Sequence, residues 1–216
     1  MVSQFCSPSA AFALITYGAL ACGTAMATPV GPAAPSSASY LANFSASCNP
    51  DWSGCVGNEA GYPTATVVSI LKPRSGQYPF TVRGVGYTLW EDGWMLNASM
   101  AHEVVVWVQS DVKVPDANPI VLEQFSVAAE ARQPFGTYSF NHILTTPITL
   151  EPGERLYVGV QLAADDDSAM CLVYCSDSNW SAPDEDYWSD QDWQTYIWDE
   201  LDNFGIYYNL RIWARG

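Results

Sequence analysis

The side chains best suited to chemistry are concentrated in one stretch of the chain, residues 165–202. This stretch holds twelve carboxylates, no lysine or arginine, and four of the nine tryptophans. Turn-forming residues between them, as in the run 181–186, predict long loops at one end of a domain. Carboxylates and indole rings in loops suit two kinds of ligand, a calcium ion and a sugar. The alternative without a ligand is an acidic, solvated surface whose aromatic rings cover the end of the domain.

Calcium is the first candidate ligand. It takes about six to eight oxygen ligands, and neighbouring carboxylates in loops can supply several of them. The candidate ligands form two acidic runs: Asp165, Asp166, Asp167, Asp184, Glu185 and Asp186. Neither run follows an EF-hand pattern, so the same residues also fit a solvated acidic face. Calcium is the one cofactor that the sequence predicts.

A carbohydrate is the second candidate ligand. A flat indole stacks on the apolar face of a sugar ring, while fixed polar side chains accept hydrogen bonds from its hydroxyl groups. The predicted ligand-binding residues are Trp180, Tyr187, Trp188, Asp190, Asp192, Trp193 and Trp198. The competing interpretation is that these rings pack the loops against the domain.

Catalysis has less support in the sequence. The two histidines, His102 and His142, lie outside any His-Glu-x-x-His motif, and the chain has no Gly-x-Ser-x-Gly elbow. A glycoside hydrolase needs two carboxylates about 5 to 9 Å apart across a cleft. Glu103 and Glu123 are the candidates carried by predicted strands. The sequence therefore predicts a non-catalytic protein, with a small glycoside hydrolase as the enzymatic alternative.

The cysteines predict disulfide bonds. Of six cysteines, four lie beyond the apolar leader: Cys48, Cys55, Cys171 and Cys175. An even number in an exported chain favours two disulfides over a four-cysteine zinc site. In a continuous strand the last two would be about 13 Å apart, too far to bond. Either a turn brings them together and both pairs are local, or each cysteine pairs with the other cluster.

The first residues predict export. No charged residue precedes Asp51, and an apolar run within residues 1–27 ends in an Ala-x-Ala sequence, which is typical of a signal peptide. A lipobox-like sequence before Cys22 is the alternative, and would make the protein a lipoprotein. Residues 28–39 read as a flexible Pro/Ser/Ala spacer, and 40–216 as a single domain. No later apolar run is long enough to predict a transmembrane span, so the domain is expected outside the cell or on its surface.

Charge and composition exclude two further classes of protein. A formal net charge of −15 would repel a phosphate backbone, which argues against a nucleic-acid partner. With 49% hydrophobic and 13% aromatic residues, the chain is too apolar to be a disordered acidic protein.

The hydrophobic pattern after residue 62 predicts an all-β domain. Short β-branched and aromatic segments are separated by turn residues, at 64–71, 80–90, 103–109, 120–127, 137–144, 155–162 and 205–214. In 155–162 every second residue is apolar, and 206–212 repeats this alternation, as expected for antiparallel strands with one buried face. Such a series without helices predicts a two-sheet antiparallel sandwich of jelly-roll type with long acidic, Trp-rich loops near the C-terminus.

The turn and strand at 148–160, together with the closing strand at 209–212, resemble the secreted bacterial jelly-roll domains that serve as accessory or surface modules. The resemblance implies a non-catalytic domain, and some such domains bind polysaccharide or structural calcium. The predicted function is therefore an extracellular or cell-surface module that binds or adheres to polysaccharide or another surface ligand. A purely structural envelope or matrix protein is the alternative.

Overall fold

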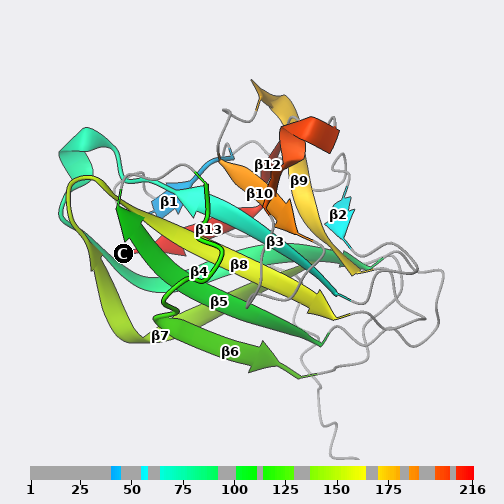
Figure 1. The fold of residues 1–216 in the computed structure, drawn as a ribbon, viewed down its shortest axis with the longest axis horizontal. Coiled ribbons are helices and arrows are strands. Elements are labelled where there is room, and N and C mark those ends of the chain that lie inside the picture. The colour runs from blue at the N-terminus through cyan, green and yellow to red at the C-terminus, as the bar shows by residue number, and fades with distance from the viewer. Residues whose placement is uncertain are drawn as a thin grey trace, which may run out of the picture.

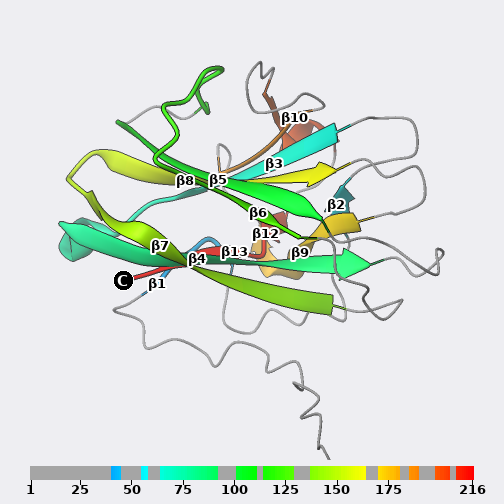
Figure 2. The same ribbon diagram turned by 90° about the horizontal axis from the view of Figure 1, so that it is seen from below.

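The computed structural model describes ten stretches of the 216-residue chain: 40–44, 55–57, 64–91, 101–110, 114–128, 137–163, 170–180, 185–189, 198–204 and 208–216. The predicted leader, spacer and lipobox cysteine lie outside these residues. Two antiparallel sheets pack face to face, and Figure 2 shows them edge-on as two layers. The predicted two-sheet antiparallel sandwich is confirmed, whereas its assignment to the jelly-roll type stays a prediction.

The first sheet has seven strands. Their order is β1-β13-β4-β9-β12, with β2 paired to β9 and β7 paired to β4 (Figure 1). The strands are β1 (Tyr40–Ala42), β2 (Cys55–Gly57), β4 (Phe80–Glu91), β7 (Thr137–Leu150), β9 (Met170–Trp180), β12 (Tyr208–Leu210) and β13 (Ile212–Arg215).

The second sheet has six strands in the order β11-β10-β3-β8-β5-β6. The strands are β3 (Thr64–Leu71), β5 (His102–Ser110), β6 (Glu123–Val127), β8 (Glu154–Ala163), β10 (Asp186–Ser189) and β11 (Asp199–Glu200). Two short 3-10 helices, η2 (Ser75–Gln77) and η3 (Leu201–Phe204), complete the described elements.

The central core lies between the sheets and follows the predicted alternation. In β8, Leu156, Val158, Val160 and Leu162 are fully buried, and Leu210 and Ile212 meet them from the first sheet. Burial of apolar surface on this scale is the main stabilising term of such a fold.

The second sheet is also buried on its outer face. Tyr157, which alternates with the core residues of β8, is 0% exposed and stacks on Trp107, with 5.3 Å between ring centroids. We call this group the outer cluster: Val68, Ile70, Val105, Trp107, Tyr157 and Tyr187. Val121 and Trp198 pack over it. The expectation of a half-buried β8 is therefore wrong, because residues from outside the strand, including Val121 and Trp198, cover the face that alternation alone leaves open to water.

Two predicted segments differ from the observed elements. The predicted strand 205–214 is divided at Arg211, whose N–H donates to Val173 on β9 while its carbonyl accepts from Thr88 on β4. The chain changes partner strand at this residue. In addition, β9, β10 and β11 occupy parts of the 165–202 stretch that was expected to be loops, which corrects that expectation. Strand pairing with β3 and β4 organises residues whose local pattern suggests turns.

The positions of Cys171 and Cys175 on β9 exclude a disulfide between them. Cys171 and Cys175 lie in the same strand, where β2 pairs regularly with residues 171–173. Four residues of extended strand separate their Cα atoms by about 13 Å, beyond the reach of a disulfide. Cys175 is nevertheless buried and disulfide-bonded. Its partner is therefore not Cys171, and a bond to Cys48 or Cys55 is the remaining predicted arrangement.

We expect non-reducing digestion and mass spectrometry to find Cys175 linked to a peptide that contains Cys48 or Cys55. Reduction should lower the free energy of unfolding by about 2 to 5 kcal/mol, since such a bond ties the start of the domain to β9. A peptide with an internal bond between Cys171 and Cys175 would contradict this prediction.

Candidate functional site

Three predicted binding residues have described side chains: Tyr187 and Trp188 lie on β10, and Trp198 directly precedes β11 in the two-stranded ribbon that β10 and β11 form. This ribbon lies at one edge of the six-stranded sheet, where Tyr187 pairs with Glu200 and Trp188 pairs with Asp199. Alternation along these short strands sends neighbouring side chains to opposite faces. The ribbon therefore presents two faces, each with an aromatic and a carboxylate residue.

Tyr187 belongs to the interior. Its ring is 1% exposed within the outer cluster, and its hydroxyl donates to Glu200 Oε1 at 3.3 Å. A ring covered in this way cannot stack on a sugar. The structure thus corrects the assignment of Tyr187 to a ligand surface and places it in packing.

Trp188 and Trp198 keep part of their surface exposed. Trp188 packs against the central core, whereas Trp198 packs against the outer cluster and donates its Nε1–H to the carbonyl of Asp116 at 3.0 Å. Exposed Asp199 lies next to Trp198 in the chain and pairs with Trp188 across the ribbon. These three residues remain candidates for ligand contact.

Four other predicted binding residues have no described side chain. Trp180 is the last residue of β9, and only its backbone is described. The remaining three lie outside the described residues: Asp190, Asp192 and Trp193. Their assignment stays a prediction.

Only two of the six predicted calcium ligands are described, Glu185 and Asp186. Asp165, Asp166, Asp167 and Asp184 lie outside the described residues. Glu185 is half-buried, and its carbonyl accepts from the Ile70 N–H at 2.7 Å. Asp186 is only 3% exposed and faces the interior, so it does not serve an ion bound at the surface. Within the described ranges, no three acidic, histidine or cysteine side chains are grouped to hold a metal.

Asp186 belongs instead to a buried polar cluster between the sheets. Its Oδ2 accepts from the Leu210 N–H at 3.2 Å. Asn43 donates to Ser69 Oγ at 3.3 Å and to the Ile70 carbonyl at 3.0 Å, and Asn209 donates to the Asn43 carbonyl at 2.8 Å. Ser69 faces Asp186 in the β3–β10 register. The cluster links both sheets through polar contacts.

Burial favours the neutral form of the Asp186 carboxyl group. The pKa of Asp186 is raised to about 7, mainly by desolvation and also by the charges of Glu185 and Asp202. The hydrogen bonds from Ser69 and Leu210 lower it by a smaller amount. Among the described residues, the Asp186 Oδ1 atom has no hydrogen-bond partner. The sequence does not reveal this cluster, because its members come from four separate strands and loops.

The candidate catalytic carboxylates lie on opposite faces of one sheet. Glu103 pairs with Ser126, and Glu123 pairs with Val106, so the two acids occupy positions of opposite alternation on the β5–β6 ladder. Glu103 accepts from Gln124 and Ser126 at 3.3 and 3.2 Å on the outer face. The pair therefore cannot act across one cleft, which removes the geometric basis for Glu103 and Glu123 as a glycosidase pair.

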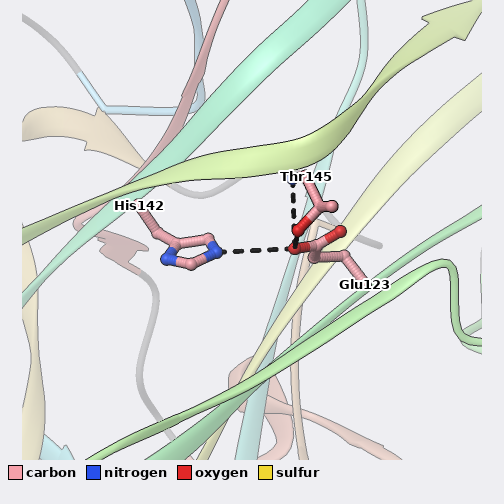
Figure 3. A network of polar contacts seen from close by, with 3 residues as sticks. All are labelled: Glu123, His142 and Thr145. Atoms are coloured by element: carbon pink, nitrogen blue, oxygen red, sulfur yellow. Dashed lines mark hydrogen bonds and ion pairs between the residues drawn. The ribbon is translucent and has the colours of Figure 1, made fainter.

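Glu123 lies in a different network, shown in Figure 3. Its Oε1 accepts from both the N–H and the Oγ1 of Thr145, at 3.2 and 2.8 Å, and lies 3.5 Å from His142 Nε2. Burial by itself would raise the pKa of Glu123, but the Thr145 hydrogen bonds and His142 outweigh it and hold the pKa below its usual value. The threonine hydroxyl donates to the carboxylate and not to the imidazole, so the histidine does not activate it as a nucleophile.

Comparison of the chain with models of known protein families, with curated proteins and with solved structures finds no significant match. Across the described residues, no helix has the length and apolar character needed to cross a membrane.

Proposed function

We propose that this protein is a non-catalytic, exported binding module that contacts polysaccharide or another surface ligand through the β10–β11 ribbon. The supporting observation is that this edge of the sandwich carries two partly exposed indole rings on opposite faces of the sheet, Trp188 on β10 and Trp198 next to β11, with exposed Asp199 paired to Trp188. An indole supplies apolar contact area to a sugar ring, and a carboxylate accepts hydrogen bonds from its hydroxyl groups.

The described acids on strands β5 and β6 favour binding over catalysis. Glu103 and Glu123 face opposite sides of their sheet, and both carboxylates accept hydrogen bonds from neighbouring side chains. The runs 165–167 and 190–193 would extend the ligand surface beyond the ribbon. Calcium bound by the first of these runs would order that extension.

The test is retention of the purified protein on a panel of insoluble polysaccharides and cell envelopes, with Ca2+ or with a chelator, while the supernatant is assayed for released sugar. We expect retention without release. Asp199→Asn and Trp198→Ala should each weaken retention by about tenfold in Kd, because they remove a polar contact and a stacking surface. Asp199 is exposed, so its variant should keep the melting temperature of the wild type.

Trp90→Ala is the matched control, since Trp90 is a partly buried tryptophan on the other sheet. Its retention should match that of the wild type. Absence of retention on every substrate would overturn the proposal in favour of a structural envelope or matrix role, and release of sugar would establish a hydrolase.

A further inference from the structure

The two margins of the six-stranded sheet differ in charge. At one margin, β11 consists of Asp199 and Glu200, and a margin strand with acidic side chains is protected against pairing with another acidic chain. At the other margin, β6 pairs only with β5 in the described residues (Figure 1). Alternate backbone N–H and C=O groups of a margin strand point away from the sheet, where a further strand can bind them. Whether β6 accepts such a strand depends on its side chains.

The side chains of β6 leave this margin without an exposed charge. Gln124 and Ser126 are exposed and uncharged, and both donate hydrogen bonds to Glu103 on β5. Glu123 carries the one charge of the strand, and its side chain is 11% exposed, with Oε1 bound by the Thr145 hydroxyl at 2.8 Å. An added strand therefore removes little water from this carboxylate, because the fold already shields it and supplies its hydrogen bonds.

Exposed apolar side chains lie beside the same margin. Among the described residues, four large apolar side chains are exposed, and three of them precede β6: Val114, Ile120 and Leu122. Ile120 is 84% exposed and Leu122 is 52% exposed. The Leu122 N–H donates to the Val106 carbonyl at 2.9 Å, which continues the contact with β5. Apolar surface of this kind beside an unpaired strand is typical of a protein–protein interface.

We propose that β6 pairs antiparallel with β6 of a second copy of this chain. The pairing joins two six-stranded sheets into one continuous sheet across a two-fold axis. A chain of net charge −15 repels its own copies, so self-association requires a contact at which few charges meet. Of the two margins of this sheet, β6 meets that condition and the acidic β11 does not.

A register centred on Phe125 suits each pair across the axis. It places Phe125 opposite its own copy, Gln124 opposite Ser126, and Glu123 opposite Val127. The two phenyl rings add apolar contact area, and the amide and hydroxyl groups can hydrogen-bond to each other. No carboxylate lies opposite another carboxylate, which would destabilise the pairing. The sequence of β6 is therefore compatible with its own antiparallel copy.

The pairing also uses the apolar surface beside β6 and leaves the ribbon free. In the same register Leu122 lies near Ala128 of the second copy, a residue that is exposed in the single chain. Because β11 is the opposite margin, the dimer carries one β10–β11 ribbon at each far end. If the ribbon binds polysaccharide as proposed above, the dimer is bivalent and is retained more strongly on a surface with many sites.

Sedimentation velocity of the intact protein, at concentrations from about 1 μM to about 1 mM, tests the pairing. We expect a monomer–dimer equilibrium in the wild type. Gln124→Lys combined with Ser126→Lys should raise the dimer Kd at least about tenfold, because four ammonium groups would then meet across the axis. Both positions are exposed, so this variant should keep the melting temperature of the wild type.

Asn141→Lys combined with Thr146→Lys is the matched control, since both residues are exposed on β7, at a margin of the other sheet. It adds the same charge and should keep the dimer Kd of the wild type. The proposal is overturned if the wild type is monomeric at every concentration, or if the β6 and β7 variants dimerise equally well. Loss of polysaccharide retention by an intact dimer would refute the role of the ribbon and leave the β6 pairing standing.

Cysteine cross-linking tests the register. Gln124→Cys mixed with Ser126→Cys should form a disulfide between the two variants, because opposite residues of antiparallel strands have Cβ atoms about 4.5 to 5.5 Å apart. Each variant alone should cross-link at least about tenfold less, since its two copies of the cysteine lie diagonally, about 7 to 8 Å apart. Equal cross-linking of the mixture and of the separate variants would overturn the register centred on Phe125.

Discussion

Gly86→Ala is expected to lower the free energy of unfolding by about 3 kcal/mol, a large overpacking effect. Gly86 lies on β4 directly opposite Trp213 of β13. A Cβ atom at this glycine would lie 2.3 Å from Cε2 of the indole, and 2.4 and 2.5 Å from two further ring atoms. Trp213 is 2% exposed and has the Phe44 ring edge-on at 6.1 Å, so it has little room to move. Urea unfolding followed by circular dichroism measures the loss.

A control variant, Gly76→Ala, and a double variant with Trp213→Ala test whether the clash with the indole causes the loss of stability in Gly86→Ala. Gly76→Ala should change stability by less than about 0.5 kcal/mol, because a Cβ atom added at Gly76 would have no other atom within 4 Å. In a Trp213→Ala background, Gly86→Ala should cost much less than it does in the wild type, since the clashing ring is gone. Equal costs in both backgrounds would show that the glycine matters for another reason.

Asp186→Asn is expected to stabilise the protein at pH 8 and to flatten its stability profile between pH 4 and pH 7. The ordinary pKa of this carboxyl is 3.8, and burial raises it to about 7 in the folded protein. Between these values the folded state holds a proton that the unfolded state releases, so stability falls as pH rises. About three pKa units correspond to a loss of roughly 4 kcal/mol, complete above pH 7.

Asparagine has the shape of aspartate and retains an oxygen for the Leu210 N–H, but it carries no charge to desolvate. The variant should therefore match the wild type near pH 4 and exceed it at pH 8, measured as the urea midpoint at each pH. Asp199→Asn, at an exposed carboxylate, should leave the profile unchanged. A wild type whose stability is constant from pH 4 to pH 7 would refute the charge assignment at Asp186.

The sequence was sufficient to predict the class of fold and much of its central core. Apolar residues in 155–162 recur with a period of two, which only an extended strand converts into one apolar face. Leu156, Val158, Val160 and Leu162 occupy that face. Export and the candidate ligand residues were also inferred from composition and local pattern. Of the binding candidates, Trp188 and Trp198 keep the partial exposure that a ligand surface needs.

The tertiary structure decided which of the candidate residues share a face and which are buried. The β5–β6 register separates Glu103 from Glu123, and β7 brings Thr145 and His142 to the second of them. Residues from other strands bury Tyr187 and Asp186, although both lie in an acidic stretch whose composition predicts exposure. The physical reason is that alternation depends on neighbours in sequence, whereas register, burial and the resulting pKa depend on segments distant in the chain.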